Sequence, residues 1–374
     1  MKIPTRKQTR SFFEELSNLE DKRDNRGKVH DFAFVLCGVC LAIMTGRSKP
    51  SSIYRYLRNR FRWLRRATKF KARTALSLAQ LYRFLEQVSW EALNDLIYQH
   101  FQFQIDVKDD EWYAVDGKAL RGSPGQAIVS FRSHESGMIV GQERIAGNKE
   151  SEITAVRNLL EEQNLWSYKM TLDALHLNPK TTAGLHQKGG GYLIQAKDNQ
   201  ETLLDQMKTI AETGDPLGYS ESVDKAHGRL EERKASFFAI ESSLLDVRWN
   251  KSGLKGLVVM ERTTEILKTG KITKEISYYV TNQPVGTTQA QQELFQAIRR
   301  HWGVESDHWI RDVTFNEDHV KSTATNRGQI LALLRTLTLY LFRKMKIKNM
   351  QEAIENFVDS PETFKRFLYE ANFL

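Results

Sequence analysis

The chain has 374 residues, of which 40% are hydrophobic and 27% charged, so it is long enough for two or three domains with an apolar core. Its main apolar run, Asp31 to Met44, is shorter than the about 20 residues that cross a bilayer. The first ten residues also lack the apolar segment of a signal peptide. We therefore expect a cytoplasmic protein without a membrane span.

The net charge of +9 is concentrated in the N-terminal part of the chain. Residues 1–110 contain 21 Lys and Arg against 12 Asp and Glu, whereas residues 111–374 contain 34 of each. Within the first part, Arg47 to Arg73 holds eleven basic residues and no acidic one. Such a distribution is typical of a surface that binds a polyanion such as nucleic acid.

The N-terminal part is predicted to be helical. Asp31 to Met44 reads as a buried helix, and its Cys37 and Cys40 are expected to be buried free thiols, because no second cysteine pair completes a zinc site. Ser77 and Ser89 are predicted caps of two further helices. Residues 1–108 are therefore expected to form a compact helical domain.

A basic amphipathic helix is predicted to begin at Ser51 or Ser52. At helical spacing, Ile53, Leu57 and Leu64 face the core. The opposite face is basic, and we expect it to contact DNA phosphates through Arg55, Arg58, Arg62 and Arg65. A solvated basic face without a ligand is the alternative.

A mixed sheet is predicted to follow. A strand ends in Asp116, two antiparallel strands and a helix come next, and a later strand ends in Asp173. Another strand ends at Lys197. Both acidic residues would then lie at one edge of the sheet, although aspartates at strand ends also commonly serve turns.

Residues 216–283 contain short β runs, which we interpret as a β-rich insertion. It includes His227 to Arg233, HGRLEER, whose basic groups suit either a phosphate backbone or a surface cluster of ion pairs. A helix beginning near Gln289 follows, then a long helix from Asn326 to Lys346. Residues 346–374 are expected to form a helical tail.

Glu305 is the most informative single residue of the helix that begins near Gln289. One stripe of this helix carries Ile298, Trp302, Trp309 and Val313, and Glu305 projects from its middle. A carboxylate that faces a core needs a partner or a metal ion. A structural Glu neutralised by a neighbouring arginine is the alternative, and so is a zinc site with His301 and His308, although such spacing does not converge well on one ion.

Three carboxylates, two on strands and one on a helix, can hold two divalent ions for phosphodiester chemistry. Oxygen ligands favour Mg²⁺ or Mn²⁺ over zinc. Asp116, Asp173 and Glu305 are therefore the candidate catalytic and metal-binding residues.

The sequence resembles the H-repeat-associated group of bacterial insertion-sequence transposases. The motifs that carry this resemblance extend over nearly the whole chain and are DGKALRGS, GMIVGQERIAGNKESEITAV, TLDALHLN, AKDNQ, HGRLEER, HWGVES and HWIRDVTFNED. The resemblance implies a DDE catalytic domain of ribonuclease-H-like fold, with Asp116, Asp173 and Glu305 as its metal-binding triad. Broader relatives have Tyr, Arg and Lys where this chain has Ile298, His301 and Asp312.

The function that we expect is that of a DNA transposase, which binds its element ends as a homodimer on double-stranded DNA and carries out Mg²⁺-dependent cleavage and strand transfer. The candidate phosphate contacts beyond the N-terminal helices are Lys118, Arg121, Lys197, His227, Arg229 and Arg233. The catalytic domain is predicted at residues 109–345. A nuclease of the same fold and a non-catalytic DNA-binding protein are the alternatives.

Overall fold

The computed structural model describes residues 10–24, 28–70, 74–101, 110–123, 125–146, 149–226, 228–241, 243, 245–322 and 325–374. In these residues helices and a large mixed sheet are combined, as predicted. None of the described helices is both long and apolar enough to pass through a membrane.

The N-terminal part is helical and follows the predicted boundaries closely. Its helices are α1 (Phe12–Leu16), α2 (Phe32–Met44), α3 (Pro50–Asn59), α4 (Phe61–Ala67), α5 (Leu78–Gln87) and α6 (Trp90–Phe101). Asp31 caps α2 by accepting a hydrogen bond from the Phe34 N–H, and every residue of α2 is buried. Cys37 and Cys40 are buried free thiols, which confirms the prediction.

The basic segment forms two helices, whereas the sequence predicted one. Arg60 leaves helical geometry, with φ −99° and ψ 9°, and separates α3 from α4. The break lets Trp63 stack on Phe364 of a C-terminal helix, with ring centroids 5.9 Å apart. The apolar stripe is nevertheless confirmed, because Ile53, Leu57 and Leu64 are all buried.

The described residues form a nine-stranded sheet in the order β3-β2-β1-β4-β5-β9-β8-β7-β6. Its strands are β1 (Trp112–Ala119), β2 (Gln126–Ser133), β3 (Ile139–Ala146), β4 (Lys169–Leu172), β5 (Gly191–Ala196), β6 (Gly218–Ala226), β7 (Arg229–Ala239), β8 (Gly256–Ile266) and β9 (Lys271–Thr281). β1, β4 and β5 are parallel, and the remaining neighbours are antiparallel.

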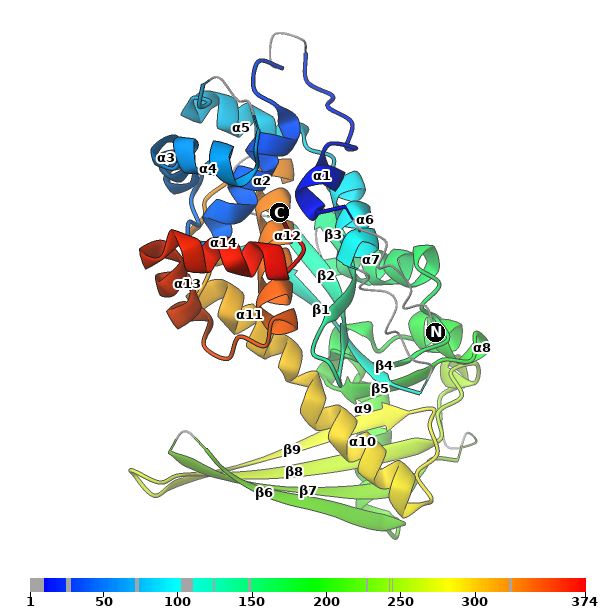
Figure 1. Cartoon of the computed structure of the whole chain (residues 1–374). Helices are drawn as coiled ribbons and strands as arrows, with labels where there is room; N and C mark the ends of the chain where they lie inside the picture. The colour runs from blue at the N-terminus through cyan, green and yellow to red at the C-terminus, as the bar shows by residue number, and fades with distance from the viewer. Residues whose placement is uncertain are drawn as a thin grey trace, which may run out of the picture.

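The β-rich insertion continues the central sheet. β9 pairs with β5 from Leu193↔Thr281 to Ala196↔Tyr278, so β9, β8, β7 and β6 extend the same sheet outward. These long strands form the lower part of the molecule in Figure 1, where α10 (Thr288–His301) crosses from them toward the helices.

Helices cover both faces of the sheet. Successive residues of a strand point to opposite faces, so neighbouring residues of β5 contact different helices. Tyr192 and Ile194 pack with α7 (Lys149–Glu162), α8 (Pro179–Gln187) and α9 (Glu201–Thr213), whereas Leu193 packs with α10. On the α10 side lie also α11 (Gly303–Val313) and α12 (Thr325–Lys344), and Ala332 of α12 contacts Ile128 of β2. The catalytic candidates of the sheet and of α11 are thus brought to one face.

The two ends of the chain share one hydrophobic core. It contains residues of α1 to α6 together with α12, α13 (Met350–Asp359) and α14 (Pro361–Glu370). The backbone N–H groups of Phe12 and Phe13 donate to the carbonyls of Asn372 and Phe373. Blue and red helices accordingly lie side by side in Figure 1. The division into residues 1–108, 109–345 and 346–374 stays a prediction.

Candidate active site

Asp116 and Asp173 lie next to each other because of the strand register. β1 and β4 run parallel, and their last paired residues are Val115 and Leu172. Each aspartate directly follows that pair. Asp116 is nevertheless inside β1, opposite Ser130 of β2, because β1 continues to Ala119 where the sequence analysis ended the strand at Asp116.

Glu305 approaches from the first turn of α11, but its surroundings differ from the prediction. The expected helix is broken at Trp302, which ends α10 and precedes α11. Ile298 is buried as predicted, but Trp302, Trp309 and Val313 are 47%, 62% and 57% exposed, so the rest of the predicted core-facing stripe is wrong. Glu305 itself is exposed. The break changes the phase of the helix, and it turns the face that carries Glu305 toward solvent.

The charges of the three acids act on one another. The pKa of Asp116 is raised to about 7, first by burial and then by the charges of Asp173, Glu152 and Glu305, whereas a hydrogen bond from the Gly117 N–H opposes the shift. The pKa of Glu305 is also raised, first by partial burial and then by Asp173, while Lys197 and Arg262 oppose the change. Electrostatic coupling of this kind requires the groups to lie close together.

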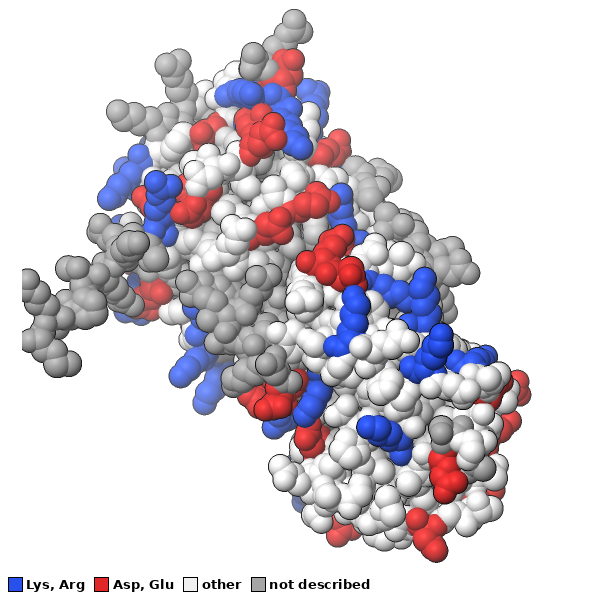
Figure 2. All heavy atoms as spheres, turned by 90° about the vertical axis from the view of Figure 1, so that its right-hand side faces the viewer, with Lys and Arg blue, Asp and Glu red and all other residues white. Residues whose placement is uncertain are grey.

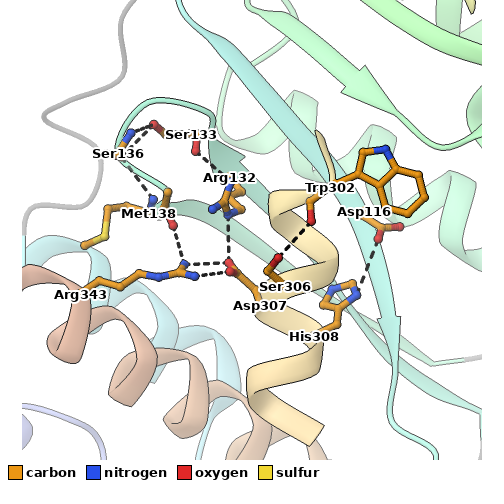
Figure 3. A network of polar contacts seen from close by, with 11 residues as sticks. Asp116, Arg132, Ser133, Ser136, Met138, Trp302, Ser306, Asp307, His308 and Arg343 are labelled. Atoms are coloured by element: carbon orange, nitrogen blue, oxygen red, sulfur yellow. Dashed lines mark hydrogen bonds and ion pairs between the residues drawn. The ribbon is translucent and has the colours of Figure 1, made fainter. Parts of the chain in front are cut away.

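Neutral histidines surround these acids. His308 Nδ1 lies 3.8 Å from Asp116 Oδ2, and burial together with Arg311 and Lys118 lowers its pKa to about 3 (Figure 3). His301 Nδ1 and His134 Nε2 lie 2.8 and 3.0 Å from the same Thr171 hydroxyl oxygen. Burial lowers the pKa of His301 to about 4 and that of His134 to about 3, so these rings supply no cation to Asp116 at neutral pH.

The donor set fits a hard divalent cation. Three carboxylates provide oxygen ligands, and Asp116 is partly buried without a Lys or Arg ion pair among the described residues. No metal site is preformed, because no three of His, Cys, Asp or Glu among the described residues are close enough to hold an ion as they stand. This holds for the three acids and equally for the zinc alternative of His301, Glu305 and His308.

Asp307 fixes α11 against the rest of the molecule. Its side chain is almost fully buried and accepts hydrogen bonds from Arg132 Nε of β2, at 3.0 Å, and from Arg343 Nη1 of α12, at 2.8 Å (Figure 3). Arg343 also donates to the carbonyl of Gly137, at 2.6 Å. A Cβ on Gly303 would lie 2.5 Å from Arg132 Nη1, so the close start of α11 requires glycine. The contacts of Asp307 with Arg132 and Arg343, which we call the clamp, hold α11 in place and thereby set the position of Glu305.

Lys118 is not a surface phosphate contact, which corrects the prediction. It is 6% exposed, and its Nζ lies 2.6 Å from Asp312, 3.8 Å from Glu317 and 3.7 Å from Asp318. Because β1 continues past Asp116, Lys118 points to the same face as Asp116 and lies under α11. Asp312 is occupied by this ion pair, which weakens it further as a metal ligand.

The other predicted phosphate contacts differ in accessibility. Arg121 is 82% exposed, and Lys197 is 54% exposed with its Nζ 3.9 Å from Asp173 Oδ1. Arg229 is exposed. Arg233 instead forms ion pairs with Asp224 and Glu231, as in the ion-pair alternative. His227 lies outside the described residues.

The basic face of α3 and α4 is exposed. No ion pair within the described residues involves the four arginines Arg55, Arg58, Arg62 and Arg65. Figure 2 shows the side of the molecule opposite to these helices, and there Lys and Arg are mixed with Asp and Glu. This exposed face, whose four arginines form no ion pair among the described residues, agrees with the concentration of positive charge in the N-terminal part of the sequence.

No functional role was predicted from the sequence for Glu152, Thr171, His134, His176 or Asp307. Glu152 looked like an ordinary polar residue in the first turn of a helix, where acids are common. Asp307 is buried because of the orientation of α11. This orientation could not be predicted, because the sequence does not show the break at Trp302. His134 and His176 are isolated histidines in the sequence, so no spacing pattern links them to the site.

The family comparison agrees with this geometry. A family model described as "Transposase DDE domain" matches residues 99–341, and a model described as "DDE_Tnp_1-associated" matches residues 13–101. "Putative transposase YncI" of Escherichia coli O157:H7 is 26% identical over 351 residues, which cover 90% of this chain and 88% of that protein. "H repeat-associated putative transposase YhhI" of Escherichia coli K12 is 27% identical over 253 residues, which cover 64% of this chain and 66% of that protein. The chain therefore belongs to the family of transposase DDE domains, and the resemblance to its H-repeat-associated group is confirmed.

Proposed function

We propose that the protein binds the ends of its own mobile element, cuts the DNA strands with Mg²⁺ or Mn²⁺, and joins the freed 3′ hydroxyl groups to target DNA. One observation carries this proposal. The β1–β4 register places Asp116 beside Asp173, and α11 adds Glu305, whose charge acts on Asp116. This is a set of oxygen ligands for phosphodiester chemistry.

The three acids would hold two divalent ions. When bound, such ions lower the pKa of the attacking water or sugar hydroxyl and stabilise the leaving oxygen. Asp116 lies within β1 and Asp173 directly follows β4, whereas the position of Glu305 depends on the contacts of Asp307 with Arg132 and Arg343. The protein would thus supply the three ligands from packed elements, and the bound ions would draw the acids together.

Double-stranded DNA is the proposed partner. The exposed arginines of α3 and α4 would bind phosphates by charge, and Lys197 and Arg121 would hold the backbone near the acids. A homodimer on DNA follows from the need to join two element ends to one target in concert.

The test uses a labelled DNA fragment that carries the inverted repeats flanking the gene. Incubation with the protein and Mg²⁺ should release element ends and join them to a target plasmid. Cleavage without joined product would favour the nuclease alternative. Specific binding without cleavage, in either metal, would favour a non-catalytic DNA-binding protein and contradict the proposal.

A further inference from the structure

Glu152, at the start of α7, reaches the catalytic edge of the sheet. An ideal Cβ on Gly117 would lie 2.7 Å from Glu152 Oε1 and from its Cδ. Because residue 117 has no side chain, the Glu152 carboxylate fits against β1 beside Asp116, whose ionisation it opposes. The Asp116-Gly117 pair therefore provides one acid and also the space for another.

His176 lies on the other side of this carboxylate. It ends the short 3₁₀ helix η2 (Ala174–His176), which directly follows Asp173, and its side chain is fully buried. Neither of its ring nitrogens has a hydrogen-bond partner among the described residues. Its Nε2 lies 3.6 Å from Glu152 Oε1. A buried polar group without a partner is costly, so this arrangement calls for an explanation.

Glu152 has no basic partner of the usual kind. Within the described residues it forms no ion pair with Lys or Arg, and His176 is its neighbour instead. By contrast, Glu161 on the same helix binds Lys188 Nζ at 2.6 Å. A partly buried carboxylate that lies near other carboxylates and has no Lys or Arg partner lacks a counter-charge. A bound cation would supply this counter-charge, whereas a structural ion pair would already contain it.

We propose that Glu152 is a fourth carboxylate of the metal site and that His176 is its positioning residue. This inference rests on the proposed function, because it assigns a further residue to the same site. Glu152 would contribute an oxygen ligand from the α7 side of β1, opposite to Glu305 on α11. His176 would hold the carboxylate by a hydrogen bond from Nε2 once the ion draws the acids together.

The test compares Glu152→Gln with Glu162→Gln, which removes an exposed charge from the other end of α7. Thermal melting of each protein over a range of Mg²⁺ concentrations gives the apparent dissociation constant, because an ion that binds only the folded state raises the melting temperature. We expect Glu152→Gln to weaken Mg²⁺ binding about tenfold or more, in line with the loss of a ligand or its support. Glu162→Gln should leave Mg²⁺ binding unchanged.

The metal-free proteins provide a second readout. Glu152→Gln should melt at the same or a higher temperature without Mg²⁺, because it removes a negative charge from an acidic cluster. His176→Asn should weaken Mg²⁺ binding severalfold in the parent and have no further effect in Glu152→Gln, as expected of residues that act together.

Three outcomes would overturn the assignment in different ways. If Mg²⁺ stabilised the parent and Glu152→Gln equally, Glu152 would lie outside the metal site and the proposed function would be unaffected. If neither Mg²⁺ nor Mn²⁺ stabilised the parent, the metal-dependent function itself would fail. A loss of metal-free stability in Glu152→Gln with unchanged Mg²⁺ affinity would show that the contact with His176 is only structural.

Discussion

Asp116 combines burial with three acidic neighbours, and this has a consequence for stability. Its pKa is raised from 3.8 to about 7 in the folded protein, so between these values the folded state holds a proton that the unfolded chain releases. Stability must then fall as pH rises through this window. The buried histidines have the opposite effect at low pH, so a comparison with a variant is needed to isolate Asp116.

Asp116→Asn should remove this pH dependence. In EDTA, the free energy of unfolding of the variant minus that of the parent should be about 2 kcal/mol larger at pH 8 than at pH 5, because only the parent loses stability over this range. Urea denaturation at the two pH values measures this difference. A difference that does not change with pH would mean that the pKa of Asp116 is not raised.

Asp307 is the residue whose loss we expect to be most costly for α11. Asp307→Asn leaves Arg132 and Arg343 without their shared carboxylate, and breaking a buried ion pair in this way costs about 3–5 kcal/mol. Asp205→Asn is a matched control, because its ion pair with Lys208 is exposed and screened by solvent, so its loss should change stability little. Chemical denaturation of both variants would show the contrast, and equal losses would contradict the clamp.

The proximity of Asp116 and Asp173 could be predicted from the sequence, because each residue follows an apolar strand run. The metal-binding role of these two acids and of Glu305 stays a prediction. The role of Lys118 could not be predicted. The strand was predicted to end at Asp116, but β1 continues to Ala119, so pleating turns Lys118 inward among Asp312, Glu317 and Asp318. The mistake came from one strand boundary.

At the scale of elements, α10 and α11 show the limit of helical periodicity. Pattern and spacing predict a helix over this region, and both halves are helical. The break at Trp302 cannot be read from periodicity, because the predicted stripe of Ile298, Trp302, Trp309 and Val313 continues across it. Gly303, which follows the break, lies against the Arg132 side chain of β2.

The basic face of α3 and α4 is expected to supply most of the non-specific DNA affinity. Changing Arg55, Arg58, Arg62 and Arg65 to Gln should reduce the salt dependence of binding, because each phosphate contact contributes a slope of about −0.9. The control changes the exposed residues Lys180, Lys188 and Lys255, which lie outside α3 and α4. Fluorescence anisotropy at several salt concentrations gives both slopes. An unaltered slope in the folded arginine variant would mean that this face does not bind DNA.

Alanine substitutions of Arg229 and Arg233 on β7 should have different effects on stability and on DNA cleavage. Arg233 Nη1 binds Asp224 at 2.8 Å, and Arg299 of α10 binds the same carboxylate at 2.7 Å, so Arg233 links strands and helix. Arg233→Ala should therefore lower the melting temperature. Arg229→Ala, at an exposed position, should lower DNA cleavage and leave the melting temperature unchanged. The opposite pattern of effects would contradict this division of roles.

At the scale of the whole molecule, two features could not be predicted from local patterns. The β-rich insertion joins the central sheet because β9 pairs with β5. The sequence of a strand does not show which distant strand it pairs with. The N-terminal and C-terminal helices share a core, although each set reads as an amphipathic group by itself. The fold class was nevertheless predicted correctly, because the order of helices and strands was clear.

The central claim is that Asp116, Asp173 and Glu305 act on DNA through shared metal ions. The most direct measurement is Mg²⁺-dependent cleavage of a labelled element end by the parent and by Asp116→Asn, Asp173→Asn and Glu305→Gln, at protein concentrations that give equal DNA binding. We predict that each variant binds DNA like the parent, loses cleavage, and is no longer stabilised by Mg²⁺. Near-parental cleavage by Glu305→Gln, or equal Mg²⁺ stabilisation of all four proteins, would contradict the claim.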